Sequence, residues 1–545
     1  MKRFAAFVTG VSLLAGQAGM AQMGAPGERQ ASLPASSGPL AAKYKSDADK
    51  IIAAAMSDND GYAALAYLTD HVGKRLSGST QLNTAVAWGA ELMKKAGLEN
   101  VQVQPVMVPR WVRGEESATI TYKGEAGTIV KPLHMLGLGM SVGTPKKGIT
   151  APAVFVHDFA ELDKLPDSEV KGRIVVFNPG WHGYGVGSMY RVGGPSRAAA
   201  RGAAAVLVRS ATGLAMQTPH TGTLRYDEKQ AKIPAAAISV EDAMLIERLA
   251  KEGPVTVHLA MEAHMEPDVK AGNVMGEIVG SEHPEQVVVL GGHIDSWDVG
   301  QGAQDDGGGI ISAFEAVSLL HKLGLKPKRT IRVVFWVNEE NGDAGGIAYR
   351  KWIGDRIGDQ VAAIESDMGV EKPLGIGYGG FFFAGPRRAK SPASGAAAAP
   401  ALPTAEDFDV KSLPQDAQQS FATLQDIASL LVPIGADTVL PGGGGSDIGP
   451  TTADGVPALA PRTVGEHYFD WHHTEADTFD KVDEDAFKKN TALLYGAVVC
   501  AGRHGWAPRG GEVERARVGG IGDAGTAAVL WGSRFLCVPE NNRVE

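Results

Sequence analysis

Two adjacent carboxylates, Glu339 and Glu340, follow an apolar run in the sequence. The run covers residues 331–337 and predicts a buried strand. An unpaired charge leaving the core costs free energy unless it reaches solvent or meets a positive partner. The pair therefore indicates either a solvated turn or a site that binds something positive.

Three further clusters combine acids and histidines: "GGHIDSWDVGQGAQDDGGG" with His293, Asp295, Asp305 and Asp306; "ESDMG" with Asp367; and "FDWHHTEADTFDKV" with His472 and His473. Each cluster alone has an ordinary explanation, such as a structural histidine, a helix cap or a turn. Together they supply histidines and several carboxylates at expected strand ends. That set fits a pair of divalent cations with nitrogen and oxygen ligands, and zinc is the metal it favours.

The elements that must position these residues are strands of an α/β sheet. From about Ala271 the segments 285–293 and 329–340 are nearly continuous apolar runs, which is typical of strands covered on both faces. Residues 310–324 between them repeat apolar positions at helical spacing. Residues 360–369 form another strand that ends in acids. Open α/β sheets place ligand sites at the carboxyl ends of their strands.

The preceding sequence has a different character. Residues 46–96 predict helices, and residues 101–108 alternate as in a strand. Between 115 and 263 short strands recur between turns, with helices near 196–203 and 240–253 and few metal-ligand spacings. The chain is therefore expected to divide as follows: 44–114, the first part of the main domain; 115–263, a β-rich insert; 264–505, the core of the main domain; and 506–545, an atypical tail.

The N-terminus has the pattern of a secretory signal peptide. Lys2 and Arg3 precede an apolar stretch over residues 4–14, and small residues surround an expected cleavage point after Ala21. A core helix is the alternative explanation of this stretch. Residues 22–43 predict a flexible leader, and residues 385–405 an exposed low-complexity loop. Because no later apolar stretch reaches the ~20 residues that span a bilayer, export to the periplasm or medium is expected.

The amino-acid composition limits which partners and which metal sites are expected. The 545 residues carry a formal net charge of −10, with 44% hydrophobic and 21% charged residues. This is typical of globular domains, and without a long basic run nucleic acid is not an expected partner. The only cysteines are Cys500 and Cys537, too few for a cysteine-rich zinc site. Export permits these two cysteines to pair, but the sequence does not determine whether they do.

With these motifs in view, the sequence resembles the M28 metallopeptidases, a group of di-zinc exopeptidases. The stretch around His293 is the most specific part. The segments "KPKRTIRVVFWVNEENG", "ESDMG", "GGGGSDIGP" and "HHTEADTFDKV" follow in the family's order. The resemblance covers residues 44–500. It implies a doubly wound mixed α/β sheet of the zinc exopeptidase, phosphorylase/hydrolase-like type, and identifies residues 115–263 with the family's protease-associated insert. The tail after Trp506 does not match.

The resemblance also implies metal ligands, carried over motif by motif. His293 binds one of two zinc ions, and Asp305 bridges both. Glu340 and Asp367 each bind zinc. His473 is the last histidine ligand, and choosing it over its neighbour is the least constrained of these assignments.

Other roles follow from the same motifs. Asp295 orients the His293 imidazole. Asp306 follows the bridging residue at a position where the family has a cis peptide. Glu339 is the general base, and His472 is a neighbour that contacts a ligand or the substrate.

The chemistry of the residue types agrees with these roles. Two nearby cations repel each other unless a shared carboxylate lies between them, which suits Asp305. A water held by the metals loses its proton near neutral pH, and Glu339 can carry that proton to the leaving amine. Because a glutamate that binds metal cannot easily act as a free base, Glu339 and Glu340 divide the work.

Several functions remain open from the sequence. The leading one is an exopeptidase acting on dipeptides or short peptides, and an M28 aminopeptidase or an aminoacylase-type amidohydrolase would use the same metals. A non-catalytic receptor-like ectodomain is disfavoured because every ligand position and the base carry competent residues. A zinc-storage protein would leave Glu339 without a role. Members of the family form homodimers, but the residues themselves do not determine the oligomeric state.

Overall fold

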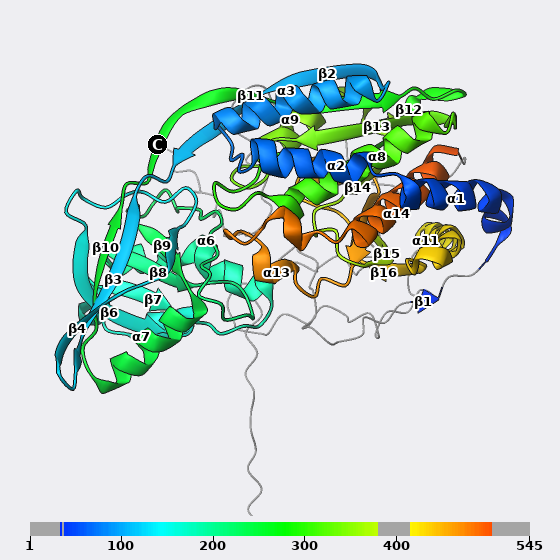
Figure 1. Ribbon diagram of the computed structural model, residues 1–545. Helices are drawn as coiled ribbons and strands as arrows, with labels where there is room; N and C mark the ends of the chain where they lie inside the picture. Colours follow the sequence, from blue (N-terminus) through cyan, green and yellow to red (C-terminus); the bar gives the residue numbers. More distant parts are fainter. Residues whose placement is uncertain (1–32, 35–36, 380–414, 504–545) are drawn as a thin grey trace, which may run out of the picture.

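The computed structural model describes residues 33–34, 37–379 and 415–503, which form two β-sheets with their helices (Figure 1). The larger sheet has nine strands in the order β1-β16-β15-β17-β14-β12-β13-β11-β2. Its central strands are mutually parallel: β17 (Ala458–Thr463), β14 (Gln360–Glu365), β12 (His283–His293) and β13 (Arg329–Trp336). Antiparallel partners flank this parallel centre on both sides, so the sheet is mixed.

The edge strands complete this sheet. β11 (His264–Ile278) and β2 (Glu99–Val112) lie beyond β13 and are antiparallel. On the other side, β15 (Pro373–Tyr378) runs antiparallel to β17 and parallel to β16 (Thr438–Pro441), and β1 (Leu33–Pro34) pairs with β16.

Both faces of the large sheet are covered. Along β12, Val288 and Leu290 belong to one apolar cluster and Val289 to another, as alternation across a pleated strand requires. The first cluster is completed by α1 (Pro39–Ser57), α2 (Asp60–Tyr67), α3 (Thr80–Lys95), α8 (Gly308–Lys322), α11 (Gln415–Ala428) and α14 (Glu484–Arg503). On the other face lie α9 (Ala344–Ile353) and the residues around α12 (Gly449–Thr452). The predicted doubly wound mixed α/β sheet is confirmed.

The smaller sheet takes its eight strands from residues 116–261, in the order β4-β3-β10-β6-β7-β8-β9-β5. It is less purely β than the sequence suggested, because β6, β7, β8 and β9 are parallel neighbours, and parallel connections need crossovers. The helices of this unit are α4 (Phe159–Lys164), α5 (Asp167–Val170), α6 (Tyr184–Ala200) and α7 (Val240–Glu252), and its strands are β3 (Glu116–Gly124), β4 (Gly127–Pro132), β5 (Met135–Gly137), β6 (Ile149–Val156), β7 (Ile174–Phe177), β8 (Ala205–Arg209), β9 (Ala235–Ile238) and β10 (Thr256–Met261).

A long antiparallel pair joins the two sheets. β2 carries the chain out of the large sheet, and β11 brings it back, with Val112 opposite His264 at one end and Glu99 opposite Glu277 at the other. In Figure 1 this pair runs along the top of the molecule toward the smaller sheet. The chain therefore enters and leaves the smaller unit at adjacent points.

Helix α1 begins at Pro39, inside the residues 22–43 that were expected to form a flexible leader. Proline at the first helical position suits a helix start, but the local sequence supplies no side-chain cap. The cap comes from α11: the Asp426 carboxylate accepts hydrogen bonds from the backbone N–H groups of Gly38, Leu40 and Ala41 at 2.6, 2.9 and 3.1 Å. A tertiary contact thus satisfies donors that a helix start leaves free.

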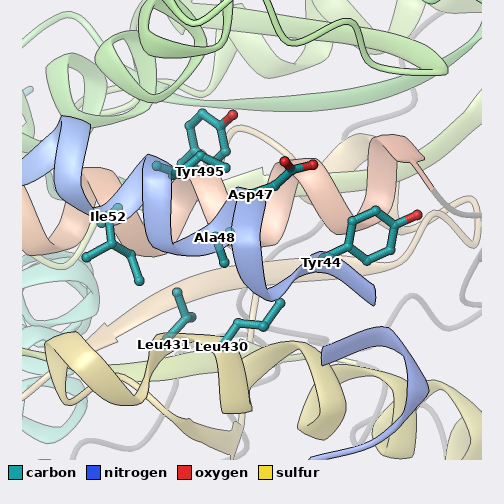
Figure 2. Close-up of a pocket in the computed structure, with 10 residues that line it drawn as sticks. Tyr44, Asp47, Ala48, Ile52, Leu430, Leu431 and Tyr495 are labelled. Atoms are coloured by element: carbon teal, nitrogen blue, oxygen red, sulfur yellow. The ribbon is translucent and has the colours of Figure 1, made fainter. Parts of the chain in front are cut away.

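The same region holds a small apolar pocket. Figure 2 shows it between α1, the turn η6 (Ser429–Ile434) and α14, lined by Ile52, Leu430 and Leu431 among others. None of the predicted metal ligands lines it. Helix α11 runs directly into this turn.

Some predictions lie outside the described residues. They concern the signal peptide, the low-complexity stretch 385–405, Cys537 and the tail 506–545. Within the described ranges, no helix is both long enough and apolar enough to cross a bilayer.

Replacing Asp426 by Ala should destabilise the protein by about 1–2 kcal/mol, because the α1 N–H groups lose a charged acceptor. Urea unfolding followed by circular dichroism measures this. Asp49→Ala is the control, since Asp49 lies exposed on α1 and only pairs with Lys45, an interaction worth about 0.3–0.5 kcal/mol. Equal effects of the two substitutions would contradict the capping role.

Candidate metal centre

The carboxyl ends of three neighbouring strands bring the predicted clusters together. β12 lies between β13 and β14 and runs parallel to both, with His293 opposite Trp336 and Gly291 opposite Glu365. His293 ends β12, Glu340 lies in the turn after β13, and Asp367 follows β14. As predicted, these three residues meet at one edge of the sheet. His472 and His473 were also expected at a strand end, but they follow the short helix α13 (Tyr468–Trp471) instead.

Asp305 presents one carboxylate oxygen to each of two donor pairs. Its Oδ1 lies 3.2 Å from His293 Nε2, and that nitrogen lies 3.5 Å from Asp367 Oδ1. Its Oδ2 lies 3.3 Å from His473 Nε2, which lies 3.1 Å from Glu340 Oε2. The five predicted ligands therefore form two sets of one imidazole and one carboxylate that share Asp305.

The spacing of these atoms fits zinc. Ligand atoms 2.0–2.1 Å from a tetrahedral zinc ion lie about 3.3 Å apart, and the four separations are 3.1–3.5 Å. His293 Nε2, Asp305 Oδ2 and Glu340 Oε1 are nevertheless buried without a hydrogen-bond partner. Donor atoms that are close but not aligned to hydrogen-bond one another are those that could share a cation.

The pKa shifts of the buried groups show that negative charge at the centre is not fully compensated. Burial raises the pKa of Glu340 to about 8, with a further contribution from Asp305, and burial raises the pKa of Asp367 to about 6. Burial alone lowers an imidazole pKa, but neighbouring carboxylates hold the pKa of His293 and of His473 well above its usual value. Bound cations would relieve this excess of negative charge.

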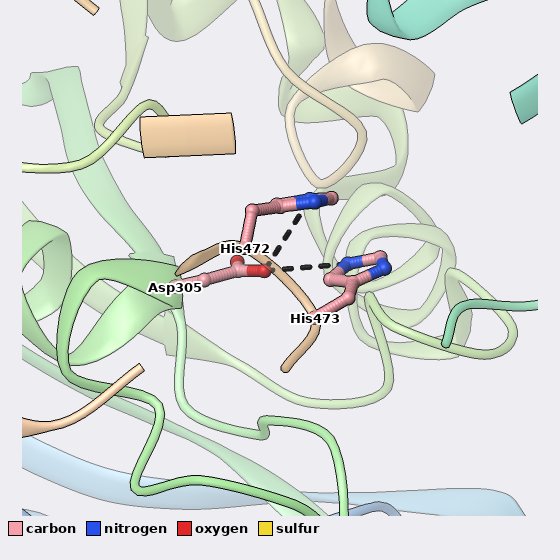
Figure 3. A group of neighbouring side chains, drawn as sticks. All are labelled: Asp305, His472 and His473. Atoms are coloured by element: carbon pink, nitrogen blue, oxygen red, sulfur yellow. Dashed lines mark ion pairs between the residues drawn. The ribbon is translucent and has the colours of Figure 1, made fainter. Parts of the chain in front are cut away.

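His472 lies at the same centre as a third imidazole. Figure 3 shows His472 and His473 both facing Asp305, with His472 Nε2 3.5 Å from Oδ2. The two rings stack with centroids 3.5 Å apart. Glu340 approaches His473 at 3.1 Å, whereas Tyr184 packs edge-on against His472. The surroundings of His473 are therefore those of the better ligand.

The short turn that carries Asp305 is held by Asp477. This turn, η2 (Ala303–Gly307), precedes α8, and its peptide between Asp305 and Asp306 is cis, as the family resemblance implied. Asp477 accepts the backbone N–H groups of Ala303, Gln304 and Asp305 at 3.1, 2.7 and 3.1 Å. The Asp305 carboxylate is therefore carried by backbone that Asp477 holds through these three hydrogen bonds.

Asp295 contacts the His293 ring through its main chain. The Asp295 carbonyl lies 3.0 Å from His293 Nδ1, whereas its carboxylate oxygen is 3.9 Å away. That carboxylate instead accepts from Ser77 Oγ and from the Glu339 N–H, both at 3.2 Å. Asp295 therefore links the first histidine to the turn that carries the expected base.

Glu339 and Glu340 take different positions in that turn. Glu340 is buried against His473, and Glu339 is partly exposed. Asn338 before them has a positive φ of 69°, a conformation that asparagine tolerates better than most residues. This conformation helps to bury one acid and to leave its neighbour partly exposed.

The sequence analysis did not identify the residues that hold the loops of the centre through backbone hydrogen bonds. Arg75 is fully buried, and its guanidinium donates to the carbonyls of Ile294, Gln301 and Gly302 at 2.6, 2.7 and 2.9 Å. It therefore clamps the loop between His293 and Asp305. Nothing in "KRLSGS" signals this contact across more than two hundred positions. Asp477 lies in the last motif, four residues after His473. That spacing was the signal that could have identified it as part of the centre.

Comparison with known proteins agrees with this geometry. Residues 273–498 match the model of peptidase family M28. Carboxypeptidase Q of Bos taurus is 38% identical over 81% of this chain and 85% of its own length.

A crystal structure of a peptidase M28 precursor from Shewanella amazonensis matches with a TM-score of 0.74 and 29% identity, over 85% of this chain and 98% of its own. A zinc aminopeptidase from Bacillus subtilis, at a TM-score of 0.57 and 18% identity over 83% of this chain and 97% of its own, shares the fold. The metal-ligand geometry, the fold and the similarity over most of the sequence lead to one conclusion: the chain belongs to peptidase family M28.

Proposed function

We propose that this M28 peptidase is a zinc-dependent exopeptidase that holds two zinc ions and hydrolyses dipeptides or short peptides. The observation that carries the proposal is the Asp305 carboxylate, whose two oxygens face two separate imidazole–carboxylate pairs. His293 and Asp367 would hold one ion, and Glu340 and His473 the other. One bridging carboxylate and two ligands for each ion leave positions open for water and substrate.

The residues divide the chemistry among themselves. Zinc held by these residues would lower the pKa of a water and polarise the scissile carbonyl. Glu339 lies in the turn beside the donors, where it can accept the proton of that water and deliver it to the leaving amine. Asp295 restrains this turn through the Glu339 N–H at 3.2 Å. The complete donor set supports an enzyme over a receptor-like ectodomain.

The other segments of the chain have proposed roles that fit this activity. Residues 1–21 would be a signal peptide, so that the enzyme acts in the periplasm or outside the cell. Residues 44–114 and 264–505 would form the peptidase domain, and residues 115–263 the protease-associated insert. The relative named carboxypeptidase Q favours substrates with a free carboxyl end, and assembly would be as a homodimer. An M28 aminopeptidase or an aminoacylase is the second candidate, because both use this donor set.

Glu339→Gln should lower kcat by about 10²–10⁴-fold, the usual contribution of a general base, while zinc content stays at two per chain. Steady-state kinetics and metal analysis of the same sample measure both. Glu475→Gln is the matched control, because Glu475 is an exposed acid within the last motif. Full activity of zinc-loaded Glu339→Gln would remove Glu339 from the mechanism.

Chelation should abolish hydrolysis, and added zinc should restore it. The metal-free protein should also unfold at a lower temperature, because buried carboxylates and imidazoles lose the cations that compensate them. Differential scanning calorimetry with and without zinc measures that shift. Activity that survives removal of all metal would rule out the metallopeptidase assignment.

A panel of dipeptides with free, N-blocked or C-blocked ends separates the candidate activities. We expect hydrolysis to require a free carboxyl end. Cleavage of C-blocked substrates with free amines would identify an aminopeptidase, and a requirement for N-acylated substrates would identify an aminoacylase. The assay measures the release of free amine from each dipeptide by the zinc-loaded enzyme.

A further inference from the structure

The smaller sheet reaches directly into the metal centre. Thr221, in the segment between β8 and β9, accepts a contact at its carbonyl oxygen from His473 Nδ1 at 3.3 Å. The Thr221 N–H in turn donates to the His473 carbonyl at 3.0 Å. Residue 221 and the histidine are more than two hundred and fifty positions apart, so only the docking of the two units creates this pair.

The nearest partner of His473 Nδ1 indicates which ring nitrogen carries the proton. The Thr221 carbonyl, at 3.3 Å, can only accept, and the donor Arg191 Nη1 is farther away at 3.5 Å, so Nδ1 is assigned as the donor. In the neutral ring Nε2 then keeps its lone pair, and Nε2 faces Asp305 and Glu340. His293 shows the same arrangement, because its Nδ1 contacts the Asp295 carbonyl at 3.0 Å. One histidine thus receives its carbonyl partner from its own loop, and the other from the smaller unit.

Arg191 holds the Thr221 carbonyl in place. This arginine lies on α6 with 7% of its surface exposed. Its Nη1 donates to the Thr221 carbonyl at 3.1 Å, and its Nη2 to the Tyr184 hydroxyl at 2.9 Å. Gly222 packs against the guanidinium with a φ of 134°, and a Cβ there would collide with it. Arg191 therefore has little freedom to release the carbonyl.

A second ionic contact ties this segment to the loop of the first histidine. Arg113, just past β2, binds both carboxylate oxygens of Asp298 at 2.8 and 2.6 Å. The same arginine donates to the Gly137 carbonyl at 2.6 Å, and Thr221 Oγ1 donates to that carbonyl at 2.7 Å. The position of Thr221 is thus fixed relative to both halves of the metal centre.

We propose that Arg191 is a positioning residue of the metal centre: it holds the Thr221 carbonyl so that His473 presents Nε2 to a metal ion. The inference rests on the proposed function, in which His473 is a zinc ligand. It makes the smaller unit a part of the metal centre. Partners of this kind typically change metal affinity by 10–100-fold.

Arg191→Met should weaken one of two zinc equivalents by about 10–100-fold and leave the other unchanged. Metal-free protein titrated with zinc against a chromogenic chelator gives both affinities. Cobalt provides a second readout, because the visible bands of only one equivalent should change. Arg191→Lys, which keeps the charge and one donor group, should lie between Arg191→Met and the unsubstituted protein.

The matched control is Arg197→Met on the same helix. Arg197 is exposed and pairs with Asp163 at 2.5 Å, so both zinc affinities should stay at the level of the unsubstituted protein. Gly222→Ala is a second route to the same loss, because it displaces the guanidinium without removing it. Near-ultraviolet circular dichroism shows whether metal-free Arg191→Met folds. If it does not fold, the zinc affinities of Gly222→Ala and Arg191→Lys test the proposal instead.

The outcomes separate the two proposals. Two zinc equivalents of unchanged affinity in a folded Arg191→Met or Gly222→Ala variant would overturn the positioning role and leave the proposed function intact. Equal weakening of both equivalents would also overturn it, because the effect would not be specific to His473. An unsubstituted protein that binds no zinc would overturn both proposals.

Discussion

A single buried carboxylate organises this protein. Asp305 divides its two oxygens between His293 and His473, and each histidine has its own carboxylate neighbour. This arrangement requires that three strand ends, the η2 turn and one distant loop arrive at the same place. Much of the surrounding architecture, from the parallel strands to the clamp of Arg75, fixes backbone around that carboxylate.

The cost of this arrangement is an accumulation of buried negative charge. Asp306, Glu365, Asp447 and Asp477 lie buried near the ligands, and burial raises the pKa of each. Buried charge of one sign is unfavourable unless it is paired or neutralised. Family membership in M28 explains the excess, because a metallopeptidase centre must carry more carboxylate than its protein cations can balance. Metal binding and stability are expected to be coupled here for that reason.

The two sheets act together at this centre. The larger one carries the predicted metal ligands His293, Glu340 and Asp367 at its carboxyl edge, and the smaller one covers the final histidines with Thr221, Arg191 and Tyr184. Tyr184 also stacks on Phe469 with centroids 4.7 Å apart, so aromatic surface from both units borders His472. The smaller unit thus contributes to the surroundings of both histidines.

The sequence by itself determined the α/β class, the strand ends and the residue types of the centre, and hence the M28 family. Local patterns suffice for these features, because apolar runs fix strands and parallel strands must place their carboxyl ends together. It did not show that α1 begins at Pro39, that Arg75 clamps the His293 loop, or that Asp295 meets His293 through its carbonyl. Only the tertiary structure decided these points, since each depends on a hydrogen bond between segments that the chain separates or on a backbone atom that carries no residue signature. The pairing of Thr221 with His473 is the extreme case, because it exists only once two independently patterned sheets have docked.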